Sequence, residues 1–224
     1  MDGKKYKTEI LPDTKGKVEF FVKVVVVGDC EVGKTAILKQ LIKKEFISEY
    51  KPTKGYEFNI CLIKVNDTVM KFQIWDMCGA ENYRTSLLQL YRNSNLGILV
   101  YSISSRQSFN NLEDWIVKLK KKAPTTKIIL LGNKSDEEDK REVTYEEGKQ
   151  ICQKHNLEYF EEISATNKFT SPNFMEIAAI SFFKDYETNG NEIFIKIYFI
   201  MYLCYRYFDY RQIYLNIQNY YILI

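Results

Sequence analysis

Residues 20–27 read FFVKVVVV, a run of aromatic and β-branched residues interrupted by a single lysine, which ends directly before Gly28. Such a run is typical of a strand that is buried on both faces of a parallel sheet. The following stretch, GDCEVGKT, matches the pattern G-x-x-x-x-G-K-[ST] and leads into a segment with helical spacing. Because a strand precedes this motif and a helix follows it, the sequence predicts a phosphate-binding loop.

The chemistry of phosphate binding requires this spacing. Glycines let the backbone wrap closely around phosphate groups and point its N–H groups inward. We expect Lys34 to reach the outer phosphates and the Thr35 hydroxyl to hold Mg²⁺. A tight strand-to-helix turn that carries a lysine by coincidence is the weaker interpretation. The predicted phosphate-binding residues are Gly28, Asp29, Cys30, Glu31, Val32, Gly33, Lys34 and Thr35.

The rest of the chain alternates between strand and helix patterns. Residues 56–76 read as a hairpin that turns at Asn66-Asp67, and further strands are expected at 96–104, 127–132 and 157–164. Helices are expected at 33–46, 80–94, 108–122 (capped by Ser108), 144–156 and 171–187. This order predicts an α/β fold with a mostly parallel six-stranded sheet and helices on both of its faces.

A second motif selects the base. In NKSD, Asp136 can accept two hydrogen bonds from the N1–H and 2-amino groups of guanine, a donor pair that adenine lacks. We expect Asn133 and Lys134 to brace the base and the first loop. The backbone of Ser164, Ala165 and Thr166 ends another strand and could meet the guanine carbonyl. A P-loop ATPase or kinase stays open as an alternative, and this motif argues against it.

The segments GDCEVGKT, YKPTKGYEF, WDMCGAENYR, VYSISSRQSFNNLEDW, GNKSD and ISAT follow one another in this order. Together they resemble a Rab-type small GTPase of the Ras superfamily. The resemblance implies a P-loop small G domain over residues 20–186 that binds GTP or GDP with Mg²⁺ and switches in vesicle and membrane traffic. It also implies effector, exchange-factor and GTPase-activating partners at the switch regions. Ras-like and Rho-like signalling GTPases are the nearer alternatives.

The resemblance also implies roles for single residues. Thr53 resembles the switch I threonine that binds Mg²⁺, and Phe46 resembles the aromatic residue that packs over the guanine. Asp76 resembles the acid that holds Mg²⁺ through water, and Gly79 the glycine whose N–H meets the γ-phosphate. Lys34, Thr53 and Gly79 would then surround the reacting phosphate.

Ala80 departs from the family pattern, which has glutamine at this position to orient the attacking water. A methyl group can neither donate nor accept a hydrogen bond, so we expect slow intrinsic hydrolysis. Two alternatives remain. Another group, such as Glu81 or a partner protein, could position the water, or the chain could be a GTP-binding interaction module without useful hydrolysis.

Three further residues near the expected phosphates are unusual. Glu31 stands where the family has a small residue, and its carboxylate would either repel the phosphates or point into solvent. Cys30 and Cys78 could together form a redox switch, although small residues that fill space are the favoured interpretation.

Composition excludes some other classes of protein. A formal net charge of +3 is too small to indicate a nucleic-acid partner. The five cysteines lack a C-x-x-C spacing, which favours a reducing compartment, and the polar start has no signal-peptide pattern. We therefore expect a cytoplasmic protein, with peripheral association with endomembranes as an open alternative.

The two ends of the chain differ from its centre. Residues 1–19 read as a flexible arm, and residues 187–224 form an atypical tail rich in Ile and Tyr without a prenylation motif. This tail could be an interfacial membrane segment, a surface for a partner, or a stretch read past a true exon end. We favour the last, so membrane association stays open.

Overall fold

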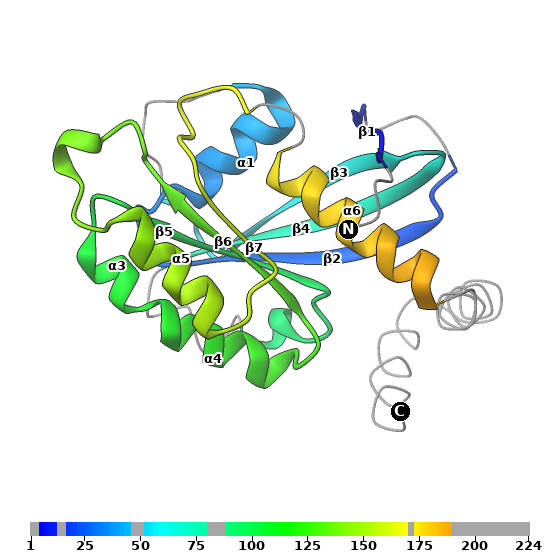
Figure 1. Ribbon diagram of the computed structural model, residues 1–224. Helices are drawn as coiled ribbons and strands as arrows, with labels where there is room; N and C mark the ends of the chain where they lie inside the picture. Colours follow the sequence, from blue (N-terminus) through cyan, green and yellow to red (C-terminus); the bar gives the residue numbers. More distant parts are fainter. Residues whose placement is uncertain (1–4, 13–16, 46–51, 80–87, 170–172, 190–224) are drawn as a thin grey trace. The chain divides into compact units, whose positions relative to one another are not determined.

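The computed structural model describes residues 5–12, 17–45, 52–79, 88–169 and 173–189 (Figure 1). The chain divides into two compact units, residues 1–180 and 181–224, which are considered separately. The strands are β1 (Thr8–Leu11), β2 (Phe20–Val27), β3 (Tyr56–Val65), β4 (Thr68–Met77), β5 (Leu96–Ser102), β6 (Lys127–Asn133) and β7 (Tyr159–Glu162). The helices are α1 (Lys34–Lys43), α3 (Arg106–Asn110), α4 (Leu112–Lys122), α5 (Tyr145–Lys154), α6 (Phe174–Asn189) and the 3₁₀ turns η1 (Leu88–Tyr91) and η2 (Glu138–Lys140).

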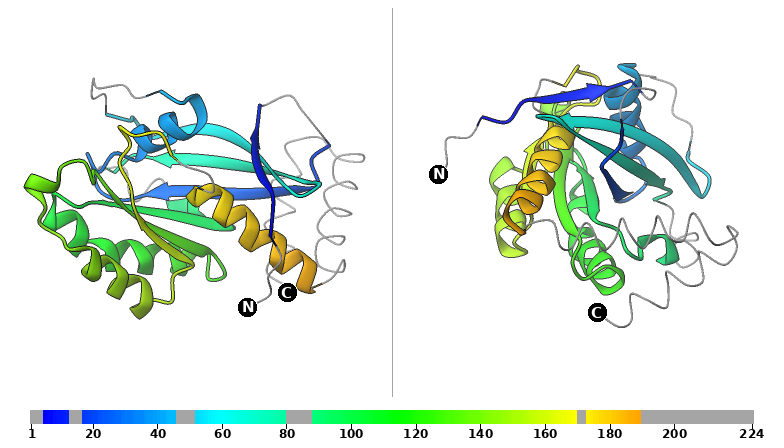
Figure 2. Two further views of the ribbon diagram at one scale, coloured as in Figure 1. Left: turned by 45° about the horizontal axis from the view of Figure 1, so that its top comes forward. Right: turned by 90° about the vertical axis from the view of Figure 1, so that its right-hand side faces the viewer.

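The strands form one seven-stranded sheet in the order β1-β3-β4-β2-β5-β6-β7. Strands β4, β2, β5, β6 and β7 are parallel, whereas β3 is antiparallel to both β4 and β1. Helix α1 lies on one face of the sheet and helices α4 and α5 lie on the other (Figures 1 and 2). The predicted α/β architecture, mostly parallel with helices on both faces, is confirmed.

The buried strands follow from their composition. All seven residues of β5 are buried, and so are six of the seven residues of β6, because helices cover both sides of these central strands. Between β3 and β4, Val65 pairs with Thr68, and Asn66 adopts a positive φ of 54°. Asparagine tolerates this left-handed conformation, which suits the two-residue turn predicted there.

The sheet has one strand more than the predicted six. Residues Thr8–Leu11, expected to be part of a flexible arm, pair in antiparallel register with Leu62–Val65 of β3. The Thr8 hydroxyl also donates a hydrogen bond of 2.7 Å to Glu176 Oε1 of α6. A four-residue strand is too short to show its period in the sequence, and its stability comes from a partner far along the chain.

The helical segment after β5 also begins earlier than predicted. Ser105, rather than Ser108, caps α3, and its side chain accepts a hydrogen bond from the Ser108 N–H. Ser108 is buried inside the helix and donates to the Ser105 carbonyl oxygen. A separate helix, α4, then starts after Asn111. Of the helix expected over residues 80–94, residues 88–94 lie within the described part of the chain, and only Leu88–Tyr91 among them form a helical turn, η1.

Candidate functional site

The phosphate loop joins the carboxyl end of β2 to the start of α1. Lys34, the first residue of α1, is only 7% exposed, and its ammonium group donates to the carbonyl oxygens of Gly28 (2.9 Å) and Asp29 (2.6 Å). Burial lowers the pKa of Lys34, and the nearby Asp76 carboxylate opposes this shift. The loop therefore curls around a fixed cation at the edge of the sheet where parallel folds bind ligands.

Three residues of this loop, Gly28, Glu31 and Gly33, have a positive φ. Gly33 has a φ of 93°, and a Cβ atom there would lie 2.2 Å from Asn133 Nδ2. Only glycine fits, because any side chain would collide with that amide. Glu31 has a φ of 63° and an exposed side chain, whereas Val32 is buried. The loop is thus closed by its backbone, while the Glu31 carboxylate is accessible to solvent.

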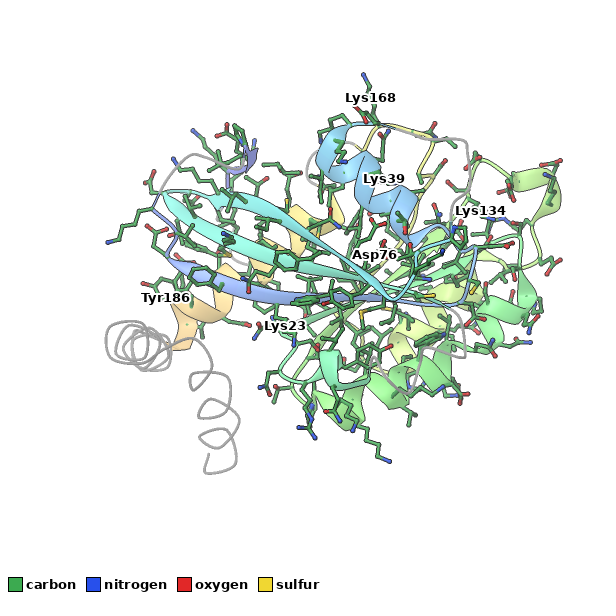
Figure 3. All side chains as sticks on the ribbon, turned by 180° about the vertical axis from the view of Figure 1, so that it is seen from behind. Lys23, Lys39, Asp76, Lys134, Lys168 and Tyr186 are labelled. Atoms are coloured by element: carbon green, nitrogen blue, oxygen red, sulfur yellow. The ribbon has the colours of Figure 1, made fainter. Side chains whose placement is uncertain are left out.

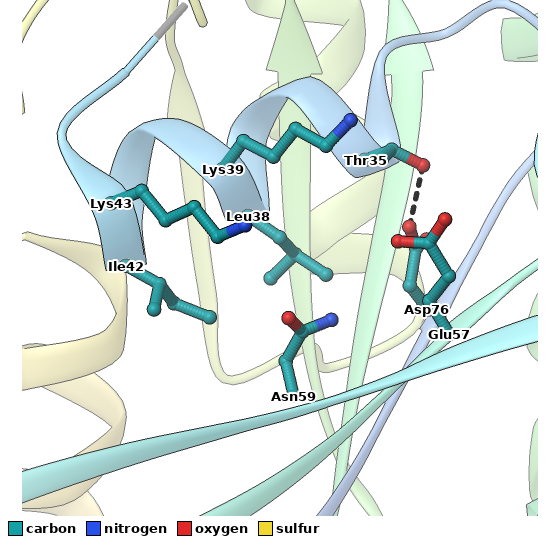
Figure 4. A pocket seen from close by; sticks show the side chains of 8 residues that line it. All are labelled: Thr35, Leu38, Lys39, Ile42, Lys43, Glu57, Asn59 and Asp76. Atoms are coloured by element: carbon teal, nitrogen blue, oxygen red, sulfur yellow. Dashed lines mark hydrogen bonds between the residues drawn. The ribbon is translucent and has the colours of Figure 1, made fainter. Parts of the chain in front are cut away.

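Three oxygen-bearing side chains meet beside the loop. Thr35 Oγ1 donates to Asp76 Oδ2 over 2.5 Å and lies 2.9 Å from Thr53 Oγ1. Asp76 is fully buried, and its other carboxylate oxygen, Oδ1, has no hydrogen-bond partner among the described residues. Figure 4 shows Thr35 and Asp76 together in a pocket between α1 and the β3–β4 hairpin.

The electrostatics of this cluster suit a divalent cation. Burial raises the pKa of Asp76 to about 6, while the Thr35 hydrogen bond, Lys34 and Lys39 oppose the rise. Figure 3 shows Asp76 beneath α1, the helix that carries Lys39. A buried carboxylate with an unpaired oxygen is costly, and a hard cation would compensate it. Hydroxyl and carboxylate oxygens are also the ligands that Mg²⁺ prefers, so the residues present fit the ion.

Gly79 lies two residues after the end of β4, against the phosphate loop. A Cβ atom on Gly79 would lie 2.5 Å from the carbonyl carbon and oxygen of Asp29 and from the Cys30 nitrogen. The absence of a side chain therefore allows the two backbones to touch. The structure places this glycine next to the loop, as its expected contact with a terminal phosphate requires.

Asn133 connects the phosphate loop to the second predicted loop. It is 2% exposed, and its side-chain amide donates to the Val32 carbonyl oxygen over 2.8 Å. Its side-chain oxygen accepts from the Ala165 N–H over 3.2 Å. One buried asparagine therefore holds together three segments that are distant in the sequence.

The remaining base-binding candidates surround this asparagine. The Ser164 hydroxyl donates to Asp136 Oδ1 and lies 2.6 Å from the Thr166 hydroxyl. Asp136 itself is exposed, so its carboxylate is accessible to a base. Lys134 adopts a left-handed conformation with a φ of 65°. The structure thus brings Asn133, Asp136 and the 164–166 segment to one edge.

Two predicted positions cannot be placed. Phe46 and Ala80 lie outside the described residues. The proposed stacking residue and the water-positioning site therefore stay predictions from the sequence.

The cysteine pair gives little support to a redox switch. Cys30 is exposed and Cys78 is half-buried. Partial burial raises the pKa of the Cys30 thiol, and the Lys34 charge only partly opposes this rise. A raised pKa lowers the fraction of reactive thiolate.

Sequence reasoning missed two residues that contact the loop. Asn111 Nδ2 and Trp115 Nε1 donate to the two carboxylate oxygens of Asp29, over 2.6 Å and 2.9 Å. Both donors come from the start of α4, more than eighty residues after Asp29. No local spacing in the sequence indicates such a contact.

Comparison with known proteins identifies the family to which this chain belongs. Residues 23–181 match the Ras family, and this match covers most of the chain. The chain belongs to the Ras family. The predicted resemblance to a Rab-type member is confirmed by its relatives.

One of these relatives is the Ras-related protein Rab-11B of Dictyostelium discoideum, which is 38% identical over 64% of this chain and 66% of that protein. The Ras-related protein Rab11C of Nicotiana tabacum is 39% identical over 68% of this chain and 69% of the relative. The Ras-related protein RABA6a of Arabidopsis thaliana is 39% identical over 66% of this chain and 63% of that relative. The chain thus spans about two thirds of the length of the relatives it matches. Within the described residues, no helix of this Ras-family chain is both long and apolar enough to cross a membrane.

Proposed function

We propose that this chain is a Rab-type small GTPase, a switch between GTP-bound and GDP-bound states that acts in vesicle and membrane traffic. The observation that carries the proposal is the Asn133 side chain, which joins the phosphate loop at Val32 to the base-side loop at Ala165. A ligand that combines phosphates with a base would span the two loops. Family membership supports the same ligand class.

Guanine is the proposed base because of Asp136. Its Oδ1 accepts from the Ser164 hydroxyl, which orients the exposed carboxylate. A carboxylate accepts two hydrogen bonds from guanine, whereas adenine would leave it without donors.

The phosphates would lie in the loop beside Lys34, with Mg²⁺ held by Thr35, Thr53 and, through water, Asp76. The ion would neutralise charge on the phosphate oxygens when bound. Lys34 supplies a fixed positive charge, and the loop backbone supplies N–H donors. Thr53, which lies beside Thr35, and Gly79, which lies beside Asp29, would respond to the terminal phosphate.

An exposed aromatic cluster supports the proposal of protein partners. Tyr56 is 47% exposed and Phe58 is 45% exposed, and both rings lie about 5 Å from Trp75. Exposed aromatic residues near a nucleotide-sensitive segment fit a surface for effector, exchange-factor or GTPase-activating proteins.

Hydrolysis is proposed to be slow because Ala80 occupies the position of the usual glutamine. Loss of a water-positioning group costs roughly a hundredfold in rate. A second candidate function, a GTP-binding interaction module without useful hydrolysis, is favoured by the same residue.

The base preference tests the proposal directly. The full chain would be titrated with fluorescent GDP and fluorescent ADP in the presence of Mg²⁺. We expect tight binding of GDP alone, and at least a tenfold loss with Asp136→Ala. Asp139→Ala, a nearby exposed acid in η2, is the matched control and should bind normally. Equal binding of ADP and GDP would contradict the proposal.

A further inference from the structure

Asp29 is held by two donors at the start of one helix: the residue that caps α4 and a residue in its first turn. Asn111, which precedes α4, donates from Nδ2 to Asp29 Oδ2 over 2.6 Å. Trp115 donates from Nε1 to Asp29 Oδ1 over 2.9 Å and is only 2% exposed. The Trp115 N–H also donates to the Asn111 carbonyl oxygen, so the two donors are one helical turn apart on the same side of α4.

The backbone of the same aspartate contacts two other parts of the site. Its carbonyl oxygen accepts from Lys34 Nζ over 2.6 Å. Its carbonyl group also lies against Gly79, because a Cβ atom on Gly79 would be only 2.5 Å from the carbonyl carbon and oxygen of Asp29. Asp29 is therefore fixed through its side chain by α4 and contacts both Lys34 and Gly79 through its backbone.

The direction of the Asp29 carboxylate matters because the loop must receive anions. A carboxylate aimed at bound phosphates would repel them. Here both of its oxygens point to neutral donors at the beginning of a helix, where the helix dipole favours negative charge. The contacts thus keep the carboxylate turned toward α4 and the backbone carbonyl toward Lys34.

We propose that Asn111 and Trp115 are positioning residues for nucleotide binding, which act through Asp29 on Lys34 and Gly79. This inference rests on the proposed function, because it concerns the affinity of that site for nucleotide. Gly79 is the expected contact of the terminal phosphate, so loss of the contacts to Asp29 weakens the GTP complex more than the GDP complex. Helix α4 thereby sets the preference of the site between the two nucleotides.

The most informative variant is Asn111→Asp. Aspartate and asparagine are equally tolerated at the start of a helix, so α4 should persist. The new carboxylate would face that of Asp29, and a favourable contact would become a repulsion. Hydrogen bonds to charged groups contribute enough that their loss changes an equilibrium about tenfold or more. We expect the GTP off-rate to rise about tenfold and the GDP off-rate to rise about threefold.

The double variant Asp29→Asn/Asn111→Asp provides the rescue. The exchanged amide can donate to the exchanged carboxylate, while its oxygen still accepts from Trp115. We expect the GTP off-rate to return to within about threefold of the unmodified chain. Trp115→Phe removes the other donor while retaining an aromatic ring. It should raise the GTP off-rate more than the GDP off-rate. Asn110→Ala, an exposed neighbour in α3, is the matched control.

The experiment measures dissociation of fluorescent GTP and GDP analogues from each full-length variant, with thermal unfolding recorded alongside. An unchanged GTP off-rate in Asn111→Asp would overturn the inference. Equal acceleration of GTP and GDP together with a lower unfolding temperature, or a double variant no better than the single one, would also overturn it. If the unmodified chain binds neither nucleotide, the proposed function itself fails, and this result is distinct from the others.

Discussion

The Asn133 side-chain amide donates to the Val32 carbonyl oxygen over 2.8 Å, across more than a hundred residues of sequence. The contact is buried, and it joins the loop at the end of β6 to the loop at the end of β2. Removal of a buried donor leaves its acceptor unpaired, which costs more than the bond itself contributes.

Asn133→Ala should therefore release GDP faster. The change removes the hydrogen bonds to Val32 and from Ala165, each of which contributes about 1 kcal/mol. We expect an off-rate that is about tenfold to a hundredfold higher, measured by displacement of fluorescent GDP. Asn110→Ala, an exposed asparagine, should have no effect. An unchanged off-rate would show that the two loops need no such connection.

Gly33→Ala tests how tightly that asparagine packs against the phosphate loop. Gly33 and Gly55 both have positive φ values, of 93° and 73°. A Cβ atom at Gly33 would lie 2.2 Å from Asn133 Nδ2, whereas one at Gly55 would meet nothing within 4 Å. We expect Gly55→Ala to lower the free energy of unfolding by about 1 kcal/mol and Gly33→Ala by about 3 kcal/mol. Denaturant unfolding measures both, and equal losses would contradict the packing described.

Thr8→Val tests the unexpected first strand. The Thr8 hydroxyl donates to Glu176, a buried residue of α6, over 2.7 Å. A methyl group in its place would leave a carboxylate oxygen facing an apolar atom, so the free energy of unfolding should fall by about 1–2 kcal/mol. Thr125→Val, at an exposed position, is the control. If both variants unfold alike in urea, β1 contributes nothing through this contact.

Glu147 predicts a pH dependence of stability. Hydrogen bonds from Arg106 and from the Thr144 backbone and hydroxyl lower the pKa of this carboxyl to about 2. The ionised form is favoured in the folded state, so the contribution is complete above the ordinary value of 4.5 and is lost as the pH falls toward about 2.

Glu147→Gln should then lower the free energy of unfolding by about 1 kcal/mol at pH 7. The value is small because the side chain is partly exposed and its charge is screened by solvent. The difference from the unmodified chain should shrink as the pH is lowered below 4.5. Glu146→Gln, its exposed neighbour, should show a much smaller difference at either pH. A difference for Glu147→Gln that is constant from pH 7 to pH 3 would contradict the assigned hydrogen bonds.

Much of the fold could be predicted because its signals are local. The apolar runs of β2, β5 and β6 identify buried strands, and Asn66-Asp67 identifies the hairpin turn. Strand β1 could not be predicted, since a four-residue strand depends on pairing with β3. Ser105 and Ser108 are equally good caps by type, and only packing around the buried Ser108 decides between them.

The candidate site likewise contains residues that the sequence predicts and residues that only the folded structure reveals. The phosphate loop is contiguous, so its glycines and Lys34 stand out in the sequence. Asn111 and Trp115 do not, because their role arises only when α4 folds against Asp29. Tertiary contacts between distant polar side chains carry no periodic pattern that a sequence can reveal.

The most direct test of the proposed function is single-turnover conversion of bound GTP to GDP by the full chain and by its Ala80→Gln variant. We predict that the unmodified chain binds GTP and hydrolyses it slowly, and that Ala80→Gln is faster by about a hundredfold. The nucleotide bound at the start of the reaction shows whether the site works at all. Equal rates for the two proteins would contradict the proposed role of Ala80, and an unmodified chain that binds no GTP would contradict the proposed function.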